Sequence, residues 1–204
     1  MVTHYTPGVR KSVEAKQETR ARLLEAAARE FGRVGFERAN IDAISMDAGF
    51  SKGTIYNYFP SKEDLFVAVV EAAAEEAAVR TSAPSDADSK VRLRASLHGF
   101  CSWAQEHQAF AQVFVRECLM GTPGLYPRVI QAEAPLVSRL EEILEEGTLR
   151  GDVRDDVSAQ VLALAIFGLT DLALVQYWAS GEGRPSFEEI PELVLTLLLG
   201  PSHQ

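Results

Sequence analysis

Apolar residues recur three and four positions apart along most of this 204-residue chain, and no segment alternates as a half-buried strand does. This spacing places one apolar stripe along each helix. It predicts an all-α fold of about nine helices. Segments rich in Gly, Pro, Ser and Asp interrupt the stripes, most clearly at residues 81–90 and 121–127, where we expect loops.

Two of the predicted helices are short and lie on either side of Gly49, within residues 41–59. Asn40 precedes the first helix and Ser51 precedes the second. Each can act as an N-cap by offering a side-chain oxygen to an unpaired backbone N–H. Two capped helices joined through a glycine turn predict a helix-turn-helix.

The second short helix carries side chains suited to reading duplex DNA, because a recognition helix presents its N-terminal residues to base edges. Lys52 can donate to guanine or to a phosphate, and Thr54 can hydrogen-bond a base or pack its methyl group on thymine. Asn57 can pair with adenine or reach the backbone. Gly53 lets the helix approach the groove without a side chain in between. The expected DNA contacts are Asn40, Ser51, Lys52, Gly53, Thr54, Tyr56, Asn57, Tyr58 and Lys62.

The remaining positions of this helix divide between the core and the surface. Ile55 and Phe59 are four residues apart and should both face inward. Tyr56 and Tyr58 should then turn their hydroxyls outward, toward phosphates. Lys62 follows at the start of the next helix, beside the expected path of the DNA backbone.

Several residues mark where other helices begin or end. Gly35 should stop the first helix, which reaches about residue 34. Ser61 and Asp64 form a variant capping box, with Asp in place of the usual Glu. Pro135 lies inside a long helical pattern, which it should kink or divide.

At this point the sequence resembles the TetR-type bacterial transcriptional regulators, through residues 19–45 and 46–70 and above all through the motifs KGTIYNYF and SKEDLF. The resemblance implies a homodimeric DNA-binding regulator with a small effector bound among the helices of a C-terminal module. The family's usual threonine pair before the second helix is Ala39 and Asn40 here, and Ser45 replaces a usual alanine. We therefore expect the same fold with a different base preference.

The net charge of −9 conflicts with DNA binding until the chain is divided at residue 62. Residues 1–62 hold ten Lys or Arg and seven Asp or Glu, a net charge of +3, and residues 63–204 hold ten and twenty-two, a net charge of −12. We expect a DNA-binding domain over 1–62, and a connecting helix with an effector-binding and dimerisation domain over 63–204. The basic part thus coincides with the helix-turn-helix.

Five basic residues enrich the segment before the helix-turn-helix. Such an arm can follow a phosphate backbone or enter a minor groove, and it can equally be a solvated tail. Both interpretations stay open. The residues concerned are Arg10, Lys11, Lys16, Arg20 and Arg22.

The last two predicted helices favour assembly with a second copy of the chain. Residues 157–178 are apolar nearly all round, which indicates burial on several sides in a soluble protein. Residues 186–199 open with the capping box of Ser186 and Glu189, and Pro191 indicates that this helix begins late or bends. We expect both segments to form a four-helix dimer interface, which would place two recognition helices about 34 Å apart on a palindromic operator. Thr170, Asp171 and the short apolar run argue against a membrane span.

The effector pocket that the resemblance implies has only loose support in the sequence. An inventory of aromatic side chains suits an apolar pocket, although core packing explains each of them as well. Asp171 lies within an apolar helix and is costly to bury unpaired, so it should pair with a buried Arg such as Arg116, bond across the dimer or meet the effector. The candidate pocket residues are Phe100, Trp103, Phe110, Phe114, Cys118, Tyr126, Phe167 and Asp171.

Other kinds of chemistry have weaker signals. The first twelve residues lack an apolar run, so we expect no signal peptide and a cytoplasmic protein, and the two cysteines should be free thiols. His98 and Cys101 could ligate a metal with His107 or Cys118, but packing and exposure explain them more simply. We expect no enzyme activity and no cofactor, because no phosphate-binding glycine motif, nucleophile elbow or zinc-protease signature is present.

The sequence therefore predicts a sequence-specific transcriptional regulator. It is expected to act as a repressor that a small-molecule effector releases from a palindromic operator. The alternative is a helical metal-binding protein or enzyme whose helix-turn-helix is only structural.

Overall fold

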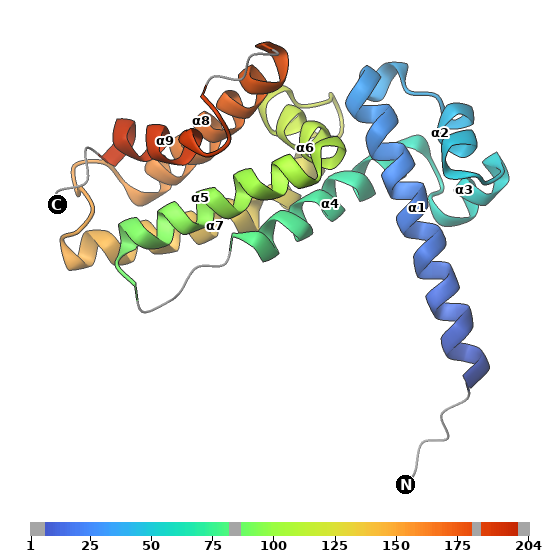
Figure 1. Cartoon of the computed structure of the whole chain (residues 1–204), viewed down its shortest axis with the longest axis horizontal. Helices are drawn as coiled ribbons and strands as arrows, with labels where there is room; N and C mark the ends of the chain where they lie inside the picture. Colours follow the sequence, from blue (N-terminus) through green and yellow to red (C-terminus); the bar gives the residue numbers. More distant parts are fainter. Residues whose placement is uncertain (1–6, 82–86, 181–184, 200–204) are drawn as a thin grey trace, which may run out of the picture. The chain divides into compact units, whose positions relative to one another are not determined.

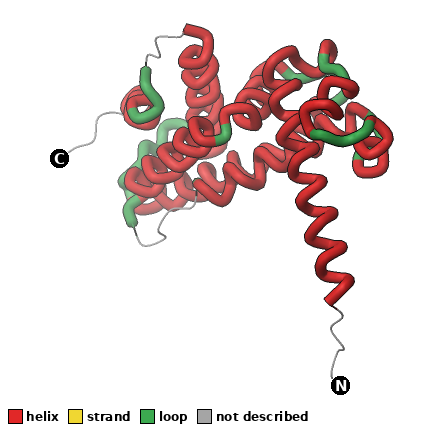
Figure 2. The backbone as a smooth tube through the Cα atoms, turned by 45° about the vertical axis from the view of Figure 1, so that its right-hand side comes forward, coloured by secondary structure: helices red, strands yellow, loops and turns green. Residues whose placement is uncertain are grey.

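The computed structural model describes residues 7–81, 87–180 and 185–199, and the side chains from residue 13 onward. The described residues form nine helices and no strand, so the predicted all-α fold is confirmed (Figures 1 and 2). The chain divides between Val69 and Val70 into two compact units. The helices are α1 Pro7–Arg38, α2 Ile41–Ala48, α3 Lys52–Tyr58, α4 Lys62–Arg80, α5 Ser89–Glu106, α6 Gln108–Met120, α7 Tyr126–Arg150, α8 Ala159–Ser180 and α9 Glu189–Leu199.

The N-terminal unit packs α1, α2, α3 and the first turns of α4 around an aromatic core. The Phe66 ring meets the rings of Phe31 and Phe36 with centroids 5.0 Å away in each case. Gly35 interrupts α1 with a φ of 80°, a left-handed conformation that favours glycine, so the predicted stop is confirmed. The last turn of α1 therefore leaves the helix axis and brings Phe36 onto Phe66.

The helix α4 carries the chain from the N-terminal unit into the C-terminal unit. Ser61 caps it as predicted, because its Oγ accepts a hydrogen bond from Asp64 N at 3.0 Å and lies 2.7 Å from Asp64 Oδ2, to which it donates. The first two turns of α4 pack within the N-terminal unit, since their apolar residues are buried there. The later turns belong to the C-terminal unit.

The C-terminal unit consists of the end of α4 and helices α5 to α9. Within it, α8 packs against α6, α7 and α9, and α5 packs against α6, α7 and α9 (Figure 1). Its core contains an aromatic cluster in which neighbouring ring centroids are 5.6 to 6.4 Å apart. The cluster is made of Phe100, Trp103, Phe114 and Phe167.

Prolines lie inside α7 and α9 without breaking either helix. α7 runs as one helix through Pro135, so it is not divided there. Pro135 is exposed, and the buried face that continues through Leu136 and Leu140 keeps the helix together despite one lost backbone hydrogen bond. α9 begins late, as predicted: Glu189 Oε2 accepts from Ser186 N at 2.8 Å, and Pro191 lies in the first turn, where no N–H is needed.

The helix α8 has 22 residues and is long and apolar enough to cross a membrane by length and composition alone. The expectation that its apolar run is too short was therefore wrong. This test is weak evidence for a span, because the core helix of a soluble protein passes it too. In the structure α8 buries Leu162, Ile166, Thr170 and Leu174 inside the C-terminal unit.

Candidate nucleic-acid interface and effector cavity

The turn between α2 and α3 closes on Gly49. Its φ of 73° and ψ of 30° are left-handed, and its N–H bonds to the carbonyl of Met46 at 3.2 Å. Phe50 N then donates to Ser45 O at 3.0 Å, which satisfies a second carbonyl at the end of α2. The chain therefore turns within three residues and places Ser51 at the start of α3.

Two arginines of α1 hold this turn from the outside. Arg22 Nη2 donates to the carbonyl of Ala48 at 2.9 Å, and its guanidinium lies 4.8 Å from the centroid of the Phe50 ring. Arg29 pairs with Asp47 at 2.9 Å. The sequence grouped Arg22 with a basic arm, but in the structure it stabilises the end of α2.

The helix α3 begins and ends where the sequence predicted. Ser51 Oγ accepts from Thr54 N at 3.2 Å, and Asn40 Oδ1 accepts from Asp42 N at 2.7 Å at the start of α2, so both predicted N-caps are confirmed. Ile55 and Phe59 are buried, as predicted, and they anchor the helix from beneath.

The outer face of α3 is polar and accessible. Lys52, Gly53, Tyr56 and Asn57 are exposed, and the Tyr56 side chain keeps 43% of its surface accessible. Tyr58 is half-buried beside Phe59, with ring centroids 6.4 Å apart. The exposed residues therefore form a compact group on one side of a helix whose other side is fixed in the core.

Two of these polar side chains already have partners inside the module. Lys52 Nζ lies 3.2 Å from Asp42, in a pair that is exposed and therefore weak. Thr54 Oγ1 lies 2.9 Å from Ser51 Oγ. Lys52 can exchange its carboxylate partner for DNA at small cost, whereas Thr54 also takes part in the cap.

Gly53 is exposed and has an ordinary helical conformation. A Cβ built on it meets nothing closer than Ser51 Oγ at 3.8 Å, which is normal van der Waals contact. Nothing within the described structure therefore requires a glycine at this position, and glycine weakens a helix interior.

Lys62 has a structural role that the sequence did not predict. Its Nζ donates to the carbonyls of Glu37 at 3.1 Å and Ala39 at 3.2 Å, and lies 4.7 Å from the centroid of the Phe36 ring. These contacts fix the connection between α1 and α2. Binding a phosphate there would require the ammonium to share its donors with these carbonyls.

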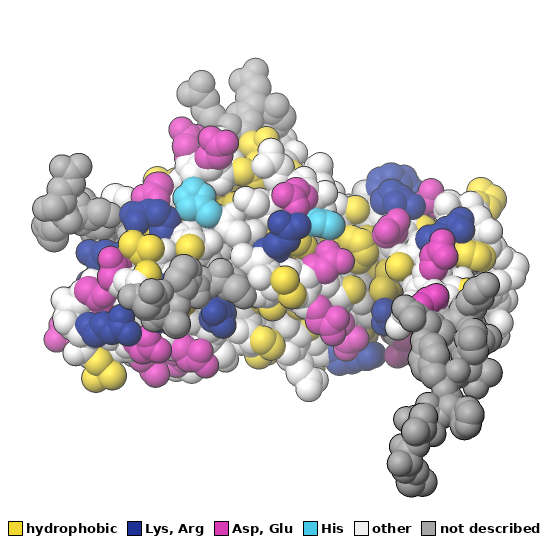
Figure 3. Space-filling view, turned by 60° about the horizontal axis from the view of Figure 1, so that its bottom comes forward, with side chains coloured by type: hydrophobic (Ala, Val, Ile, Leu, Met, Phe, Trp, Pro, Cys, Tyr) yellow, Lys and Arg dark blue, Asp and Glu magenta, His cyan; other side chains and the backbone are white. Residues whose placement is uncertain are grey.

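The predicted arm is helical from Pro7 onward. Of its basic residues, Arg20 lies with its guanidinium carbon 5.6 Å from the centroid of the Phe59 ring, and Lys16 is exposed. The side chains of Arg10 and Lys11 lie outside the described residues. Acidic and basic side chains lie intermixed on the face of the molecule that Figure 3 shows.

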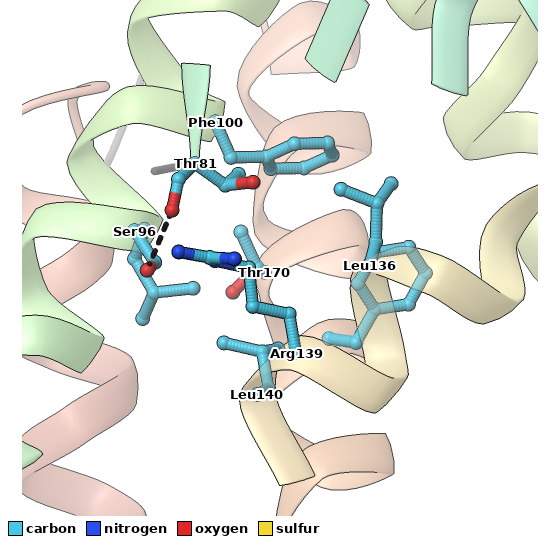
Figure 4. Close-up of a pocket in the computed structure, with 9 residues that line it drawn as sticks. Thr81, Ser96, Phe100, Leu136, Arg139, Leu140 and Thr170 are labelled. Carbon is cyan, nitrogen blue, oxygen red and sulfur yellow. Dashed lines mark hydrogen bonds between the residues drawn. The ribbon is translucent and has the colours of Figure 1, made fainter. Parts of the chain in front are cut away.

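The C-terminal unit contains a small cavity of about 20 Å³ lined by Thr81, directly after α4, and by residues of α5, α7 and α8 (Figure 4). Most of its wall is apolar. Arg139 extends from α7 into the middle of the lining side chains, in the direction of Ser96 (Figure 4). The lining residues are Thr81, Ser96, Leu97, Phe100, Leu136, Arg139, Leu140, Phe167 and Thr170.

The structure brings only two of the candidate pocket residues to this cavity, Phe100 and Phe167. Trp103 and Phe114 pack with them in the aromatic core. Phe110 is buried, Cys118 is half-buried, and Tyr126 is exposed at the start of α7. The role of these residues in binding an effector stays a prediction.

Asp171 is fully buried, and neither of its carboxylate oxygens has a hydrogen-bond partner among the described residues. The expected pairing with Arg116 is absent, and Arg116 lies 3.6 Å from Glu117 instead. Burial, with a smaller contribution from the charge of Glu133, raises the pKa of Asp171 well above its usual value. The carboxyl group is therefore stabilised in its neutral form.

Two thiols lie close enough to Asp171 to be affected by it. Burial and the Asp171 charge raise the pKa of Cys101 to about 12, and they raise the pKa of Cys118 further. Burial also raises the pKa of Glu133, which bonds to Cys118. Both cysteines are free, as predicted, and both are held as neutral thiols.

The sequence reasoning missed Arg139, although a signal was present. Leu136, Leu140 and Ile143 form the buried stripe of α7, and Arg139 falls on that stripe three residues after Leu136. A cation on an apolar face is unusual and indicates a partner or a ligand.

Among the described residues, no group of three or more His, Cys, Asp or Glu side chains could hold a metal ion.

Family models match both parts of the chain. Residues 23–69 match the model described as bacterial regulatory proteins, tetR family, and residues 86–201 match the tetracyclin repressor-like C-terminal domain. The second match alone covers more than half of the chain. This protein belongs to the TetR family.

Similar sequences within the TetR family include named regulators. The fatty acid metabolism regulator of Bacillus subtilis is 24% identical over 199 residues, which cover 94% of this chain and 99% of that protein. The repressor NicS of Pseudomonas putida is 32% identical over 154 residues, 71% of each chain. The repressor AcnR of Corynebacterium diphtheriae is 27% identical over 176 residues, 86% of this chain and 88% of AcnR.

Solved structures of TetR-like proteins share the fold. FadR from Bacillus subtilis, in complex with stearoyl-CoA, has a TM-score of 0.78 at 22% identity and covers 90% of this chain and 99% of its own. AibR, in complex with isovaleryl coenzyme A and operator DNA, has a TM-score of 0.73 at 21% identity. The match covers 90% of this chain and 100% of the AibR chain. The predicted class of protein is confirmed: this chain is a TetR-family DNA-binding transcriptional regulator.

Proposed function

We propose that the exposed face of α3 reads the operator, with Lys52, Thr54 and Asn57 directed at base edges and Tyr56, Tyr58 and Lys62 at phosphates. The observation that carries this proposal is the division of α3 into an anchored face and an exposed polar face. Ile55 and Phe59 fix the helix, while Lys52, Gly53, Tyr56 and Asn57 face solvent together. Asn40 and Ser51 contribute as caps whose helix starts point outward.

The operator is proposed to be a palindrome read by two copies of the chain. α8 and α9 expose leucine and valine side chains at helical spacing, Val161, Leu164 and Leu172 on α8 and Leu193 and Leu197 on α9. Apolar side chains that a single chain leaves exposed in this way fit a dimer interface. A second copy packed on α8 and α9 would present two recognition helices to successive major grooves.

The effector is proposed to enter the C-terminal unit at the cavity beside Arg139 and to release the repressor from DNA. Two similar structures carry acyl-CoA ligands, which supports a small-molecule site in a unit of this fold. Thr81, the residue directly after α4, is one of the lining residues, so the occupied cavity can act on the helix that leads to the DNA-binding unit.

The protein is further proposed to work in the cytoplasm, where it reaches DNA, and to have no enzyme activity. The matching family model describes bacterial regulatory proteins, and several named relatives are transcriptional regulators. Both cysteines are free thiols, which is consistent with a compartment where thiols stay reduced.

Binding to the DNA upstream of its own gene tests the proposed function. Fluorescence anisotropy with labelled duplexes should show a preference for that DNA over a shuffled duplex, and an affinity that falls steeply as salt rises. Base substitution across the bound site should reveal two related half-sites. Equal affinity for both duplexes at every salt concentration would contradict the proposal.

A further inference from the structure

Arg139 has a buried donor that the protein does not use. Its Nε is inaccessible to solvent and has no hydrogen-bond partner among the described residues. A buried guanidinium normally pairs with a carboxylate or with carbonyl oxygens, because leaving a charged donor unpaired is costly. Other arginines of the unit do have carboxylate partners, as Arg92 has Glu146.

The hydroxyl groups that line the cavity with Arg139 already donate hydrogen bonds to backbone carbonyls. Ser96 Oγ donates to Thr81 O at 2.9 Å, Thr170 Oγ1 donates to Ile166 O at 2.7 Å, and Thr81 Oγ1 donates to Ala78 O at 3.1 Å. Each hydroxyl can therefore offer only lone pairs to the cavity. Arg139 is the lining side chain that supplies hydrogen-bond donors, so the missing partner must be an acceptor.

The other residues that line the cavity indicate that the rest of the ligand is apolar. The apolar lining residues are Leu97, Phe100, Leu136, Leu140 and Phe167. The guanidinium of Arg139 lies on the side of Ser96 and Thr170, and Leu136 lies on the other side (Figure 4). In such surroundings a charge pairs far more strongly than in water, and an anion is the acceptor that best matches a guanidinium fork. A bulky polar body would leave its own groups unsatisfied against these side chains.

We propose that Arg139 binds the carboxylate of a small molecule with a compact apolar body, such as a short branched or aromatic carboxylate. This inference rests on the proposed effector site and names the chemistry of its ligand. The carboxylate pairs with Nε and a terminal nitrogen of Arg139, and the apolar body packs between Phe100, Leu136 and Phe167.

Binding of such a ligand requires the walls to move. The cavity of about 20 Å³ holds roughly one water molecule, much less than a five-carbon acid needs. Thr81 lines the cavity directly after α4, and α5 lies close to the end of α4, because a Cβ on Gly99 would lie 2.0 Å from the carbonyl oxygen of Arg80. A ligand that widens the cavity would therefore displace the end of α4. This displacement would link carboxylate binding to release of the operator.

Direct binding measurements on the full-length protein test this inference. Isothermal titration calorimetry would use isovalerate and benzoate as probes, with isoamyl alcohol, isovaleramide and isovaleryl-CoA as comparison ligands. We expect at least one of the two carboxylates to bind, and to bind at least tenfold more tightly than the alcohol and the amide. No carboxylate binding, or tighter binding of the neutral or thioester ligands, would overturn the proposal.

Substitution separates the ligand role of Arg139 from a structural one. Arg139→Met should reduce carboxylate affinity at least tenfold while the melting temperature stays the same or rises, because an unpaired buried donor is removed. Arg139→Lys keeps the charge without the fork and should restore only part of the affinity. Arg150→Met, which removes the same charge from the exposed end of α7, is the matched control and should bind carboxylate normally.

Measurements of operator binding distinguish a failure of this inference from a failure of the proposed function. Arg139→Met should bind the operator as the natural protein does and resist release by carboxylate. Carboxylate affinity that is equal in Arg139→Met and the natural protein would refute the role of Arg139 while leaving DNA recognition intact. Failure of every variant and of the natural protein to bind the operator would instead refute the proposed function.

Discussion

Gly53 lies on the proposed DNA-reading face of α3, and nothing in the described structure requires a glycine there. We predict that Gly53→Ala leaves the free energy of unfolding unchanged or raises it by up to about 1 kcal/mol, because alanine favours the helix. Operator affinity should fall at least tenfold, because the added methyl group separates α3 from the groove. Thermal unfolding and anisotropy on the same preparation measure the two effects.

A lower melting temperature for Gly53→Ala would show that the glycine serves the fold. Unchanged operator affinity would place Gly53 away from the DNA. Gly49→Ala is a useful contrast, since its φ of 73° makes any side chain strained and its Cβ would meet Arg22 Nη2 at 3.2 Å. That variant should unfold more easily whether or not DNA is present.

Asp171 gives the protein a pH dependence of stability with a definite sign. Its pKa in the folded state is raised by burial, so the folded protein binds the proton more tightly than the unfolded chain does. The stability from this group is fully present below the unfolded pKa near 3.8 and is lost as the pH rises toward the folded pKa. Neutral pH is therefore less favourable for this residue than mildly acidic pH.

We predict that Asp171→Asn removes this contribution, because an amide has no proton to lose. Urea unfolding of the natural protein and the variant between pH 4.5 and 8 should show the variant gaining stability relative to the natural protein as the pH rises. A difference in free energy that stays constant over this range would mean that Asp171 does not titrate there. A variant that becomes relatively less stable with rising pH would show that the carboxylate has a partner in the dimer.

At the scale of the helices, Lys62 connects the start of α4 to the end of α1. We predict that Lys62→Met lowers the free energy of unfolding by about 1 to 3 kcal/mol, because the carbonyls of Glu37 and Ala39 lose a charged donor. Operator affinity should also fall, by a similar factor for all operator variants, since phosphates carry no sequence. Denaturant unfolding and a panel of mutated operators measure these effects.

Lys52→Met is the matched control for this variant, because the Lys52 pair with Asp42 is exposed and should contribute little to stability. Its effect is expected on DNA alone and to depend on the bases present. Full stability of Lys62→Met would show that its contacts with the two carbonyls are energetically neutral. A changed base preference would assign Lys62 to base reading.

Local sequence determined the helix-turn-helix more completely than it determined the cavity. The bounds of α2 and α3 follow from Asn40, Gly49 and Ser51, whose capping hydrogen bonds involve residues at most four positions away. The contacts of Lys62 join residues more than twenty positions apart, and the cavity requires the packing of four helices. Aromatic residues suggested a pocket, but most of them fill the core, and the informative residue is a cation on an apolar stripe.

At the scale of the whole molecule, the proposed function requires two chains, because one recognition helix would read only half of the proposed palindrome. The exposed apolar side chains of α8 and α9 are the surface on which we expect the second copy. Their central members include Leu164, which keeps 53% of its surface accessible, and Leu197, which keeps 65%. A charge placed among them would have to be buried without a partner when the dimer forms.

We predict that Leu164→Glu converts the protein to a folded monomer that binds the operator at least a hundredfold more weakly. Leu149→Glu is the matched control: the same change at the end of α7, where the leucine is 88% exposed, should leave dimer and affinity unchanged. Sedimentation velocity gives the mass, circular dichroism the helix content, and anisotropy the operator affinity. A Leu164→Glu protein that remains dimeric would move the interface elsewhere, whereas a monomer that kept full affinity would mean that one α3 helix suffices to read the operator.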